Sequence, residues 1–414
     1  MNKEASIAVN APAISRLATA SGQRGLAAGN DELLFDVTRL VWRCWVGRLP
    51  TGIDRVCLAY LAHFARRACA VVQRGRLRLV LSYADSQALF ALILSGDPHF
   101  RRKLLALAPM ALARAALRRP RAGSVYLNIG HTGLDSDHLC PWVARHGLRP
   151  IYFVHDIIPI THPEFCREGE AAKHRRRMTT ALSSAAGIIA NSRKTLEDVA
   201  RFATRSGLPN PPGAVAWLSG IALGGRVTPA NLGRAHFITI GTIEGRKNHI
   251  LLLRLWKRMA QRLGPDTPKL VIVGQRGWEA DHAIAMLDRC QEIREHVLEL
   301  GRCEDDELAR LIKGARALLM PSFIEGFGLP VIEALALGTP VLASNLPVFR
   351  EIAGDIPTYC ESHDGKGWEE AVLSFLGDCP ERQRQIERIA QFKAPDWHGH
   401  FAQVERWLDQ DIGL

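Results

Sequence analysis

The chain has 414 residues, 47% of them hydrophobic, which is enough for two α/β domains of ordinary size. No apolar run of about 18 residues or more occurs, so no transmembrane helix is predicted. The formal net charge of +11 favours an anionic partner, either nucleic acid or an anionic membrane surface. The absence of helix-turn-helix, zinc-finger and aromatic RNA-binding signatures argues against nucleic acid.

The cysteines and the N-terminus bear on where the protein acts. The nine cysteines are scattered, odd in number and never spaced as C-x-x-C. This pattern favours reduced thiols in a cytoplasmic protein and gives no zinc-binding signature. Residues 1–30 lack a continuous apolar core, so they do not resemble a signal peptide. Because they are rich in Ala, Ser and Gly, we expect a flexible tail.

The first half of the chain alternates between predicted strands and helices, which favours an α/β fold with a mostly parallel sheet. A helix is expected from about Pro50 to Arg67, and another over 194–202 with Ser192 as its N-cap. The expected strands are residues 32–40, 77–82, 124–129, 151–154 and 187–190.

Residues 100–121 combine Leu and Ala with clustered Arg and Lys. Such a segment suits an amphipathic helix lying on an anionic bilayer. A helix that faces the core and exposes a basic surface explains the composition equally well, and Pro109 argues against one long helix. Both alternatives stay open. A second basic run, residues 173–177, is most simply a solvated helix face.

Two polar groups follow predicted strands. Asp135 and Asp137 form a D-x-D pattern, which in some enzymes holds a divalent metal on a diphosphate. Matches of three residues are common by chance, so we do not predict a metal site from them. His155 follows the strand 151–154, and ligands of open parallel sheets bind beyond the carboxyl ends of strands. A structural histidine that caps the strand end is the alternative.

The Gly- and Pro-rich residues 207–212 are expected to link two domains. In the second domain a strand over 236–241 should lead into a helix over 249–259 that Asn248 caps. Arg246 and Lys247 would lie at the N-terminus of that helix, where cations oppose the helix dipole unless an anion lies between them. Two surface cations without a ligand are the alternative. Further strands are expected at 270–274 and 297–301, and helices at 369–375, 383–392 and 401–408.

The pattern of residues 315–345 predicts a strand–loop–helix–strand unit. Gly326 and Gly328 give a loop whose backbone can approach a ligand closely, and Pro330 suits the first turn of the next helix. Free N–H groups at such a helix N-terminus form an anion site. Glu325 lies in the loop and Glu333 in the expected first turn. The helix dipole would explain Glu333 but not Glu325. Phosphates for the N–H groups and hydroxyls for the carboxylates together describe a nucleotide sugar.

The segment Glu325-Gly-Phe-Gly-Leu-Pro-Val-Ile-Glu333 resembles the E-x7-E signature of retaining glycosyltransferases of family 4 (glycosyl transferases group 1). The resemblance is strongest over 237–250 and 297–355 and weakest over 41–123. It implies the GT-B fold, an α/β architecture of two Rossmann-like domains facing each other across a cleft. The implied parts are a tail (1–30), an N-terminal acceptor-binding domain (31–212), a C-terminal nucleotide-sugar-binding domain (213–394) and a C-terminal helix that crosses back to the first domain (395–414).

The resemblance also implies a donor site that needs neither metal nor cofactor. Its catalytic residues would be His155, Lys247 and Glu325. Arg246, Lys247 and the loop amides would stabilise the β-phosphate, Glu333 would bind the ribose, Glu325 the sugar, and His155 the sugar from the opposite domain. The implied donor-binding residues are Gly52 (in a turn with Thr51 and Arg55), Thr242, Arg246, Lys247, Gly274, Glu325, Gly326, Phe327, Gly328, Leu329 and Glu333.

Three segments, 50–56, 154–159 and 241–248, resemble mannosyltransferases of bacterial surface polysaccharide synthesis. We therefore expect GDP-mannose as the donor, with dTDP-rhamnose and UDP-glucose as alternatives. A lipid-linked or lipopolysaccharide acceptor fits the basic charge, with no nucleic acid as a partner. The expected location is cytoplasmic, on the inner face of the cytoplasmic membrane. A non-catalytic nucleotide-sugar-binding protein and a nucleic-acid-binding protein are alternatives of other classes.

Overall fold

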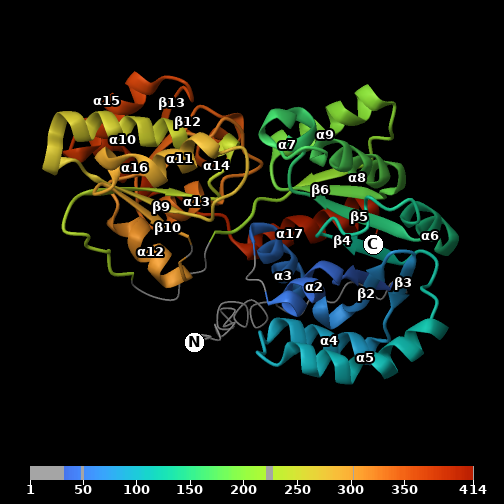
Figure 1. The fold of residues 1–414 in the computed structure, drawn as a ribbon. Helices are drawn as coiled ribbons and strands as arrows, with labels where there is room; N and C mark the ends of the chain where they lie inside the picture. The colour runs from blue at the N-terminus through green and yellow to red at the C-terminus, as the bar shows by residue number, and fades with distance from the viewer. Residues whose placement is uncertain (1–31, 48–50, 221–226, 302, 414) are drawn as a thin grey trace.

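The structure, a computed structural model, describes residues 32–47, 51–220, 227–301 and 303–413. The predicted tail, residues 1–30, and Pro50 lie outside the described residues. Figure 1 shows two α/β domains side by side, each with helices on both faces of a sheet. On β1, for example, Leu33 and Phe35 pack in one apolar cluster and Leu34 in another, because successive side chains of a strand point to opposite faces.

The N-terminal sheet has the strand order β3-β2-β1-β4-β5-β6-β7. All neighbouring strands are parallel except the antiparallel pair β2 and β3. Its strands are β1 Leu33–Asp36, β2 Ala68–Arg74, β3 Leu77–Val80, β4 Val125–Asn128, β5 Arg149–Val154, β6 Gly187–Ala190 and β7 Gly213–Val215. Its helices are α2 Thr38–Val46, α3 Gly52–Phe64, α4 Tyr83–Leu94, α5 Phe100–Leu117, α6 Leu139–His146, α7 Ile158–Thr161, α8 Glu170–Ser184 and α9 Arg193–Ser206.

The C-terminal sheet has the order β10-β9-β8-β11-β12-β13 and is parallel throughout. Its strands are β8 His236–Ile240, β9 Lys269–Val273, β10 Val297–Leu300, β11 Leu318–Met320, β12 Val341–Ser344 and β13 Thr358–Cys360. Its helices are α10 His249–Leu263, α11 Asp281–Arg289, α12 Asp305–Gly314, α13 Leu329–Ala336, α14 Pro347–Ala353, α15 Gly365–Leu376 and α16 Pro380–Ile389.

The last α-helix, α17 (Trp397–Trp407), lies on the N-terminal domain (Figure 1). His400 is central to this contact. Its Nε2 lies 2.8 Å from the Tyr60 hydroxyl of α3, and its Nδ1 lies 2.9 Å from the carbonyl oxygen of Trp217. Glu405 of the same helix pairs with His63 at 2.9 Å. The chain therefore returns to its first domain after completing the second.

The structure corrects three secondary-structure predictions. The first strand ends at Asp36, whose carboxylate accepts the N–H of Thr38 at 3.0 Å, and α2 begins there instead of the strand continuing to residue 40. β2 was not predicted, because its apolar run follows α3 with no Gly or Pro to mark a turn. α5 runs unbroken through Pro109, whose ring is exposed on the outer side of the helix.

The predicted domain boundary at residue 212 is also wrong. Residues 213–215 form β7 and pair in parallel with β6, so they belong to the N-terminal sheet. Gly207 ends α9 in the left-handed conformation, and residues 208–212 only return the chain to that sheet. The crossing to the second domain follows β7 and reaches β8 at His236.

Candidate active site

The candidate site lies at the carboxyl ends of β8 and β11, two neighbours in the middle of the C-terminal sheet. The chain continues from β8 to β9 on one side and from β11 to β12 on the other. This reversal of direction is the topological switch point, where open α/β sheets bind ligands. The loop after β8 carries Arg246 and Lys247, and the loop after β11 carries Glu325.

Glu325 is the centre of a buried charge cluster. Its Oε1 accepts hydrogen bonds from Lys247 Nζ at 2.6 Å and Ser322 Oγ at 2.7 Å, and its Oε2 accepts one from Arg246 at 2.6 Å. Arg246 also pairs with Glu244 at 2.7 Å. Glu325 is 7% exposed and Lys247 9%. Two carboxylates and two cations thus neutralise one another with little access for water.

Burial and pairing act in opposite directions on these groups. Burial by itself would raise the pKa of Glu325, but the charges of Arg246 and Lys247 outweigh it and lower that pKa to about 2. Burial lowers the pKa of Lys247, and burial raises the pKa of Glu244. Glu325 is therefore ionised at neutral pH and is matched to the two cations that face it.

The loop after Glu325 needs both of its glycines. A Cβ atom on Gly326 would lie 2.8 Å from the carbonyl oxygen of His155 and 2.9 Å from Cβ of Asp156. Gly328 has a φ of 112°, and a Cβ there would lie 2.7 Å from the ring of Phe349. No side chain fits at either position. The first of these contacts joins the two domains, because β5 delivers His155 and Asp156.

The amides of this loop are available to a ligand. Within the described part of the chain, the backbone N–H groups of residues 326–329 donate no hydrogen bond to a protein acceptor. They lead into α13, which begins at Leu329 with Pro330 in its first turn. Because such N–H groups carry the positive end of the helix dipole, the loop is suited to an anion beside Arg246 and Lys247.

His155 contributes from the opposite domain. The residue is 6% exposed, and its Nε2 lies 2.9 Å from the carbonyl oxygen of Ile129. A carbonyl can only accept, so Nε2 carries the proton and Nδ1 is left as an acceptor. Burial lowers the pKa of His155 to about 4, so the ring is neutral at pH 7. Nδ1 has no hydrogen-bond partner among the described residues and can accept a bond from a hydroxyl group.

Other predicted donor residues lie around this cluster. Thr242 follows β8, where Gly277 packs against its methyl group, and Gly274 packs against the backbone of Gly241. Phe327 is buried. Glu333 lies in the second turn of α13 and not in the first, so a role at the helix dipole does not explain it.

The structure also places Gly52, Arg55 and Asn248, three further residues that were named from the sequence. Gly52 opens α3 at the surface, and a Cβ there would meet no atom within 4 Å. Arg55 does not join the cluster, because it pairs with Asp305 of α12 at 2.6 Å. Asn248 forms no capping bond, and its side chain instead donates to the carbonyl oxygens of Pro321 and Ser362 at 3.2 and 2.8 Å.

The D-x-D pattern is placed apart from the cluster. The Asp135 carboxylate lies 3.7 Å from the guanidinium of Arg177 on α8. Among the residues that the structure describes, no group of three or more His, Cys, Asp or Glu side chains is arranged to hold a metal ion.

The sequence pattern did not indicate Glu244 or Ser322 as members of the cluster, nor the pair Ser192 and Thr195 as contacts of the Gly326 carbonyl. The sequence could have indicated Glu244, because it lies between a strand end and the two cations. The others depend on contacts between distant segments.

Comparison with known proteins agrees with this geometry. Residues 226–392 match the family model described as glycosyl transferases group 1. This match covers the sheet and the helices α10 to α16 of the C-terminal domain. The serotype-specific mannosyltransferase WbdA of Escherichia coli is 30% identical over 241 residues, which are 54% of this chain and 29% of that protein. The O-antigen chain mannosyltransferase B of Escherichia coli is 34% identical over 166 residues, 40% of this chain and 43% of that protein. The chain thus spans less than half the length of these curated relatives.

The fold comparison covers both domains. The crystal structure of an α,α-trehalose-phosphate synthase (UDP-forming) from Burkholderia vietnamiensis aligns with 94% of this chain and 99% of that chain. The TM-score is 0.56 and the sequence identity 13%, so the likeness concerns the fold alone. The predicted GT-B fold is confirmed.

Proposed function

We propose that the protein is a retaining glycosyltransferase that moves mannose from GDP-mannose to a lipid-linked or lipopolysaccharide oligosaccharide acceptor. The observation that carries the proposal is the cluster of Arg246, Lys247 and Glu325 beside the available amides of residues 326–329. A nucleoside diphosphate leaving group develops charge on its β-phosphate. Two cations and oriented N–H groups stabilise that charge without a metal ion. The names of the two mannosyltransferase relatives support mannose as the sugar.

Glu325 has two tasks in this proposal. Without donor it holds Arg246 and Lys247 in place. When a diphosphate shares the two cations, the carboxylate accepts hydrogen bonds from sugar hydroxyls and stabilises the positive charge that develops at the anomeric carbon. Glu333, on α13, accepts hydrogen bonds from the ribose.

The N-terminal domain completes the site. Neutral His155 accepts a hydrogen bond from a sugar hydroxyl through Nδ1, so activity requires the two domains to be closed. The bond between the anomeric carbon and the phosphate oxygen breaks, and the acceptor oxygen bonds to the same face of the sugar. The acceptor proton passes to the leaving phosphate. This course gives retention of configuration.

Calorimetric titration in the presence of a chelator tests the donor. We expect GDP and GDP-mannose to bind, and dTDP-rhamnose and UDP-glucose not to bind. If another donor binds instead, the proposed donor site stands and the proposed sugar is wrong. Binding only after addition of a divalent metal would overturn the metal-free site. If no nucleotide binds and RNA binds with a steep salt dependence, the protein is a nucleic-acid-binding protein.

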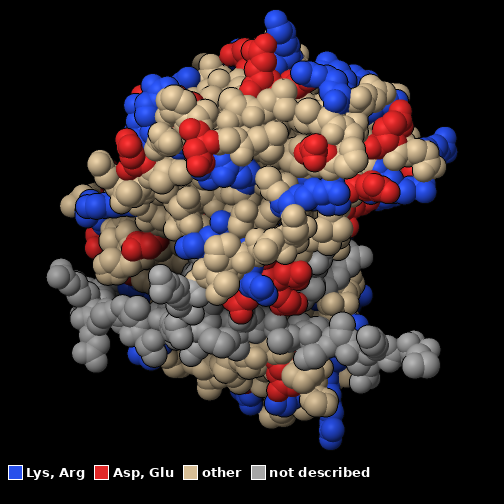
Figure 2. All heavy atoms as spheres, turned by 90° about the vertical axis from the view of Figure 1, so that its left-hand side faces the viewer, with Lys and Arg blue, Asp and Glu red and all other residues tan. Residues whose placement is uncertain are grey.

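We also propose that α5 contacts the inner face of the cytoplasmic membrane, where a lipid-linked acceptor would be met. Its residues Leu105, Met110, Leu112 and Leu117 are 45–90% exposed, and no Asp or Glu occurs between Asp97 and Asp135. The C-terminal domain differs, because both signs of charge are interspersed on the face that Figure 2 shows. No helix among the described residues has the length and apolar character to cross a bilayer.

Cosedimentation with vesicles containing phosphatidylglycerol tests the α5 contact. We expect binding that falls about tenfold in a Leu105→Ser, Met110→Ser double variant, because each exposed apolar side chain adds to membrane affinity. The control is Leu298→Ser, which changes an exposed leucine of the C-terminal domain. A basic membrane face on α5 would be contradicted if the wild type bound purely zwitterionic vesicles as tightly as those containing phosphatidylglycerol. It would also be contradicted if Leu298→Ser lost as much vesicle binding as the double variant.

A further inference from the structure

The start of α9 in the N-terminal domain touches the glycine loop of the C-terminal domain. Ser192 Oγ and Thr195 Oγ1 donate to the carbonyl oxygen of Gly326 at 3.2 and 3.3 Å. Both side chains are buried. Ser192 also caps its helix, since its Oγ accepts the N–H of Thr195 at 3.0 Å. The single hydroxyl proton of Ser192 has two acceptors within reach, Thr195 Oγ1 at 3.0 Å and the Gly326 carbonyl oxygen at 3.2 Å. When Ser192 donates to Thr195, the Thr195 hydroxyl still donates to the Gly326 carbonyl, so the other domain is contacted in either case.

This contact fixes one of the amides of the anion site. The carbonyl of Gly326 and the N–H of Phe327 belong to one trans peptide group, so they point in opposite directions. When the carbonyl is held on α9, the N–H must face away from α9. The neighbouring glycines allow many backbone conformations, and a flipped peptide would turn the carbonyl oxygen toward the anion and repel it. The loop therefore needs an external restraint.

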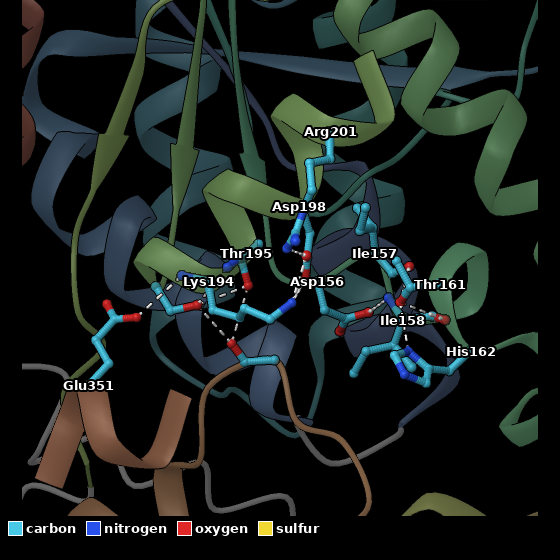
Figure 3. A network of polar contacts seen from close by, with 12 residues as sticks. Asp156, Ile157, Ile158, Thr161, His162, Lys194, Thr195, Asp198, Arg201 and Glu351 are labelled. Carbon is cyan, nitrogen blue, oxygen red and sulfur yellow. Dashed lines mark hydrogen bonds and ion pairs between the residues drawn. The ribbon is translucent and has the colours of Figure 1, made fainter. Parts of the chain in front are cut away.

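Glu351 of α14 secures the other side of the contact. Its carboxylate accepts the backbone N–H groups of Arg193 and Lys194 at 2.7 and 3.2 Å, and Trp217 Nε1 at 3.0 Å. Figure 3 shows Glu351 reaching from α14 to the start of α9 near Lys194. The first N–H groups of a helix have no partner within it and carry positive partial charge, so a carboxylate there is favourable. The cap comes from the opposite domain.

We propose that Ser192, Thr195 and Glu351 are positioning residues, which form an interdomain clasp that orients the Phe327 amide toward the donor diphosphate. The hydroxyls hold the Gly326 carbonyl, and Glu351 holds the helix that carries them. The clasp forms only when the domains are closed, so the phosphate site is complete only in that state. This role rests on the proposed function, because it needs a diphosphate at the loop.

Transfer kinetics test the positioning role. We expect a Ser192→Ala, Thr195→Val double variant to lose about tenfold to hundredfold in kcat, with KM for the donor changed less than about threefold, because a misdirected N–H mainly affects the transition state. Thr195→Ser keeps a hydroxyl and should stay within about twofold of the wild type. Glu351→Gln should have a lower kcat than the wild type. Glu197→Gln, on the exposed side of α9, should have an unchanged kcat. A normal kcat in the folded double variant would overturn the role.

Hydrogen exchange tests the clasp without any transfer assay. We expect the amides of Arg193 and Lys194 to exchange at least about tenfold faster in Glu351→Ala than in the wild type, because they lose their acceptor. Unchanged exchange would overturn the clasp while leaving the proposed function intact. If exchange responds as expected but the wild type transfers no sugar and binds no nucleotide diphosphate, the proposed function is wrong and the positioning role falls with it.

Discussion

The two domains present chemically different surfaces to each other at the candidate site. The C-terminal sheet ends in ionised groups, Arg246, Lys247 and Glu325, that are paired among themselves. The N-terminal sheet ends in the neutral hydrogen-bonding groups of His155 and Ser192, together with the carboxylate of Asp156 beside Gly326. Mutual pairing lets the charged groups stay buried without a ligand, since an isolated buried charge would cost several kcal/mol. We infer that one domain supplies the charge for binding an anion and the other supplies the geometry.

The largest effect should come from removing a charge. We expect Lys247→Ala and Glu325→Ala each to lower the transfer rate at least about a hundredfold, because each removes a group that stabilises developing charge. Lys257→Ala is the matched control, since Lys257 is a surface lysine of α10 that pairs with Glu292. Steady-state transfer with the donor identified by calorimetry gives the rates. Near-normal rates in both purified, folded variants would remove the charged cluster from the mechanism.

Nucleotide affinity should change in opposite directions within the same cluster. Lys247→Ala should weaken GDP binding about tenfold, because it removes a cation from the anion site. Glu325→Gln should strengthen GDP binding about threefold, because it removes the carboxylate that shares Arg246 and Lys247 with the phosphate. Calorimetric titration measures both. Weaker binding in Glu325→Gln would mean that Glu325 orders the cations more than it competes for them.

Acid should act on the buried neutral histidines of both domains before it acts on Glu325. Burial lowers the pKa of His155 and of His400 to about 4 each and that of His249, in the C-terminal domain, to about 3, whereas the pKa of all three in the unfolded chain is near the ordinary value of 6.5. The unfolded state therefore takes up protons first, and stability falls as pH drops from about 6.5 toward 4, by about 1 kcal/mol per pH unit for each histidine. Glu325, with its pKa lowered to about 2, adds a loss only below about pH 4.5.

Urea unfolding at pH 7, 6 and 5 measures which groups cause the first loss of stability as the pH falls. His155→Gln keeps a donor for the Ile129 carbonyl. It should lower the number of protons taken up on unfolding, which sets the slope of the unfolding free energy against pH, by about one. Glu325→Gln should leave the slope between pH 6.5 and 5 unchanged. The ordering is wrong if the slope responds to Glu325 and not to His155.

The smallest effect should come from the exposed ion pair between the domains. Arg55 and Asp305 lie 2.6 Å apart with side chains that are 45% and 24% exposed. Such pairs contribute less than about 1 kcal/mol and are screened by salt. Arg55→Gln should therefore change the transfer rate and the donor KM by less than about twofold. A loss of fivefold or more would place Arg55 in the donor site after all.

Local sequence predicted much of the C-terminal site. Gly326, Gly328 and Glu325 are neighbours along the chain, and Arg246 and Lys247 follow another strand directly. Because parallel strands deliver their following loops to one edge of a sheet, a motif after each of two strands is enough to expect one site. The same rule placed His155 at a strand end. The resemblance carried by residues 325–333 implied the two-domain GT-B fold, which the structural comparison confirms.

Tertiary structure alone decided the rest. The pairing of Glu325 with both cations, the tautomer of His155 set by the Ile129 carbonyl, and the contact of Ser192 with Gly326 each join segments distant in sequence. The domain boundary depends in the same way on β7 pairing with β6. A local pattern specifies which residues form a strand, a loop or a helix. It does not specify which strands become neighbours, and buried polar partners are chosen by that neighbourhood, because each buried donor or acceptor must be satisfied where the fold places it.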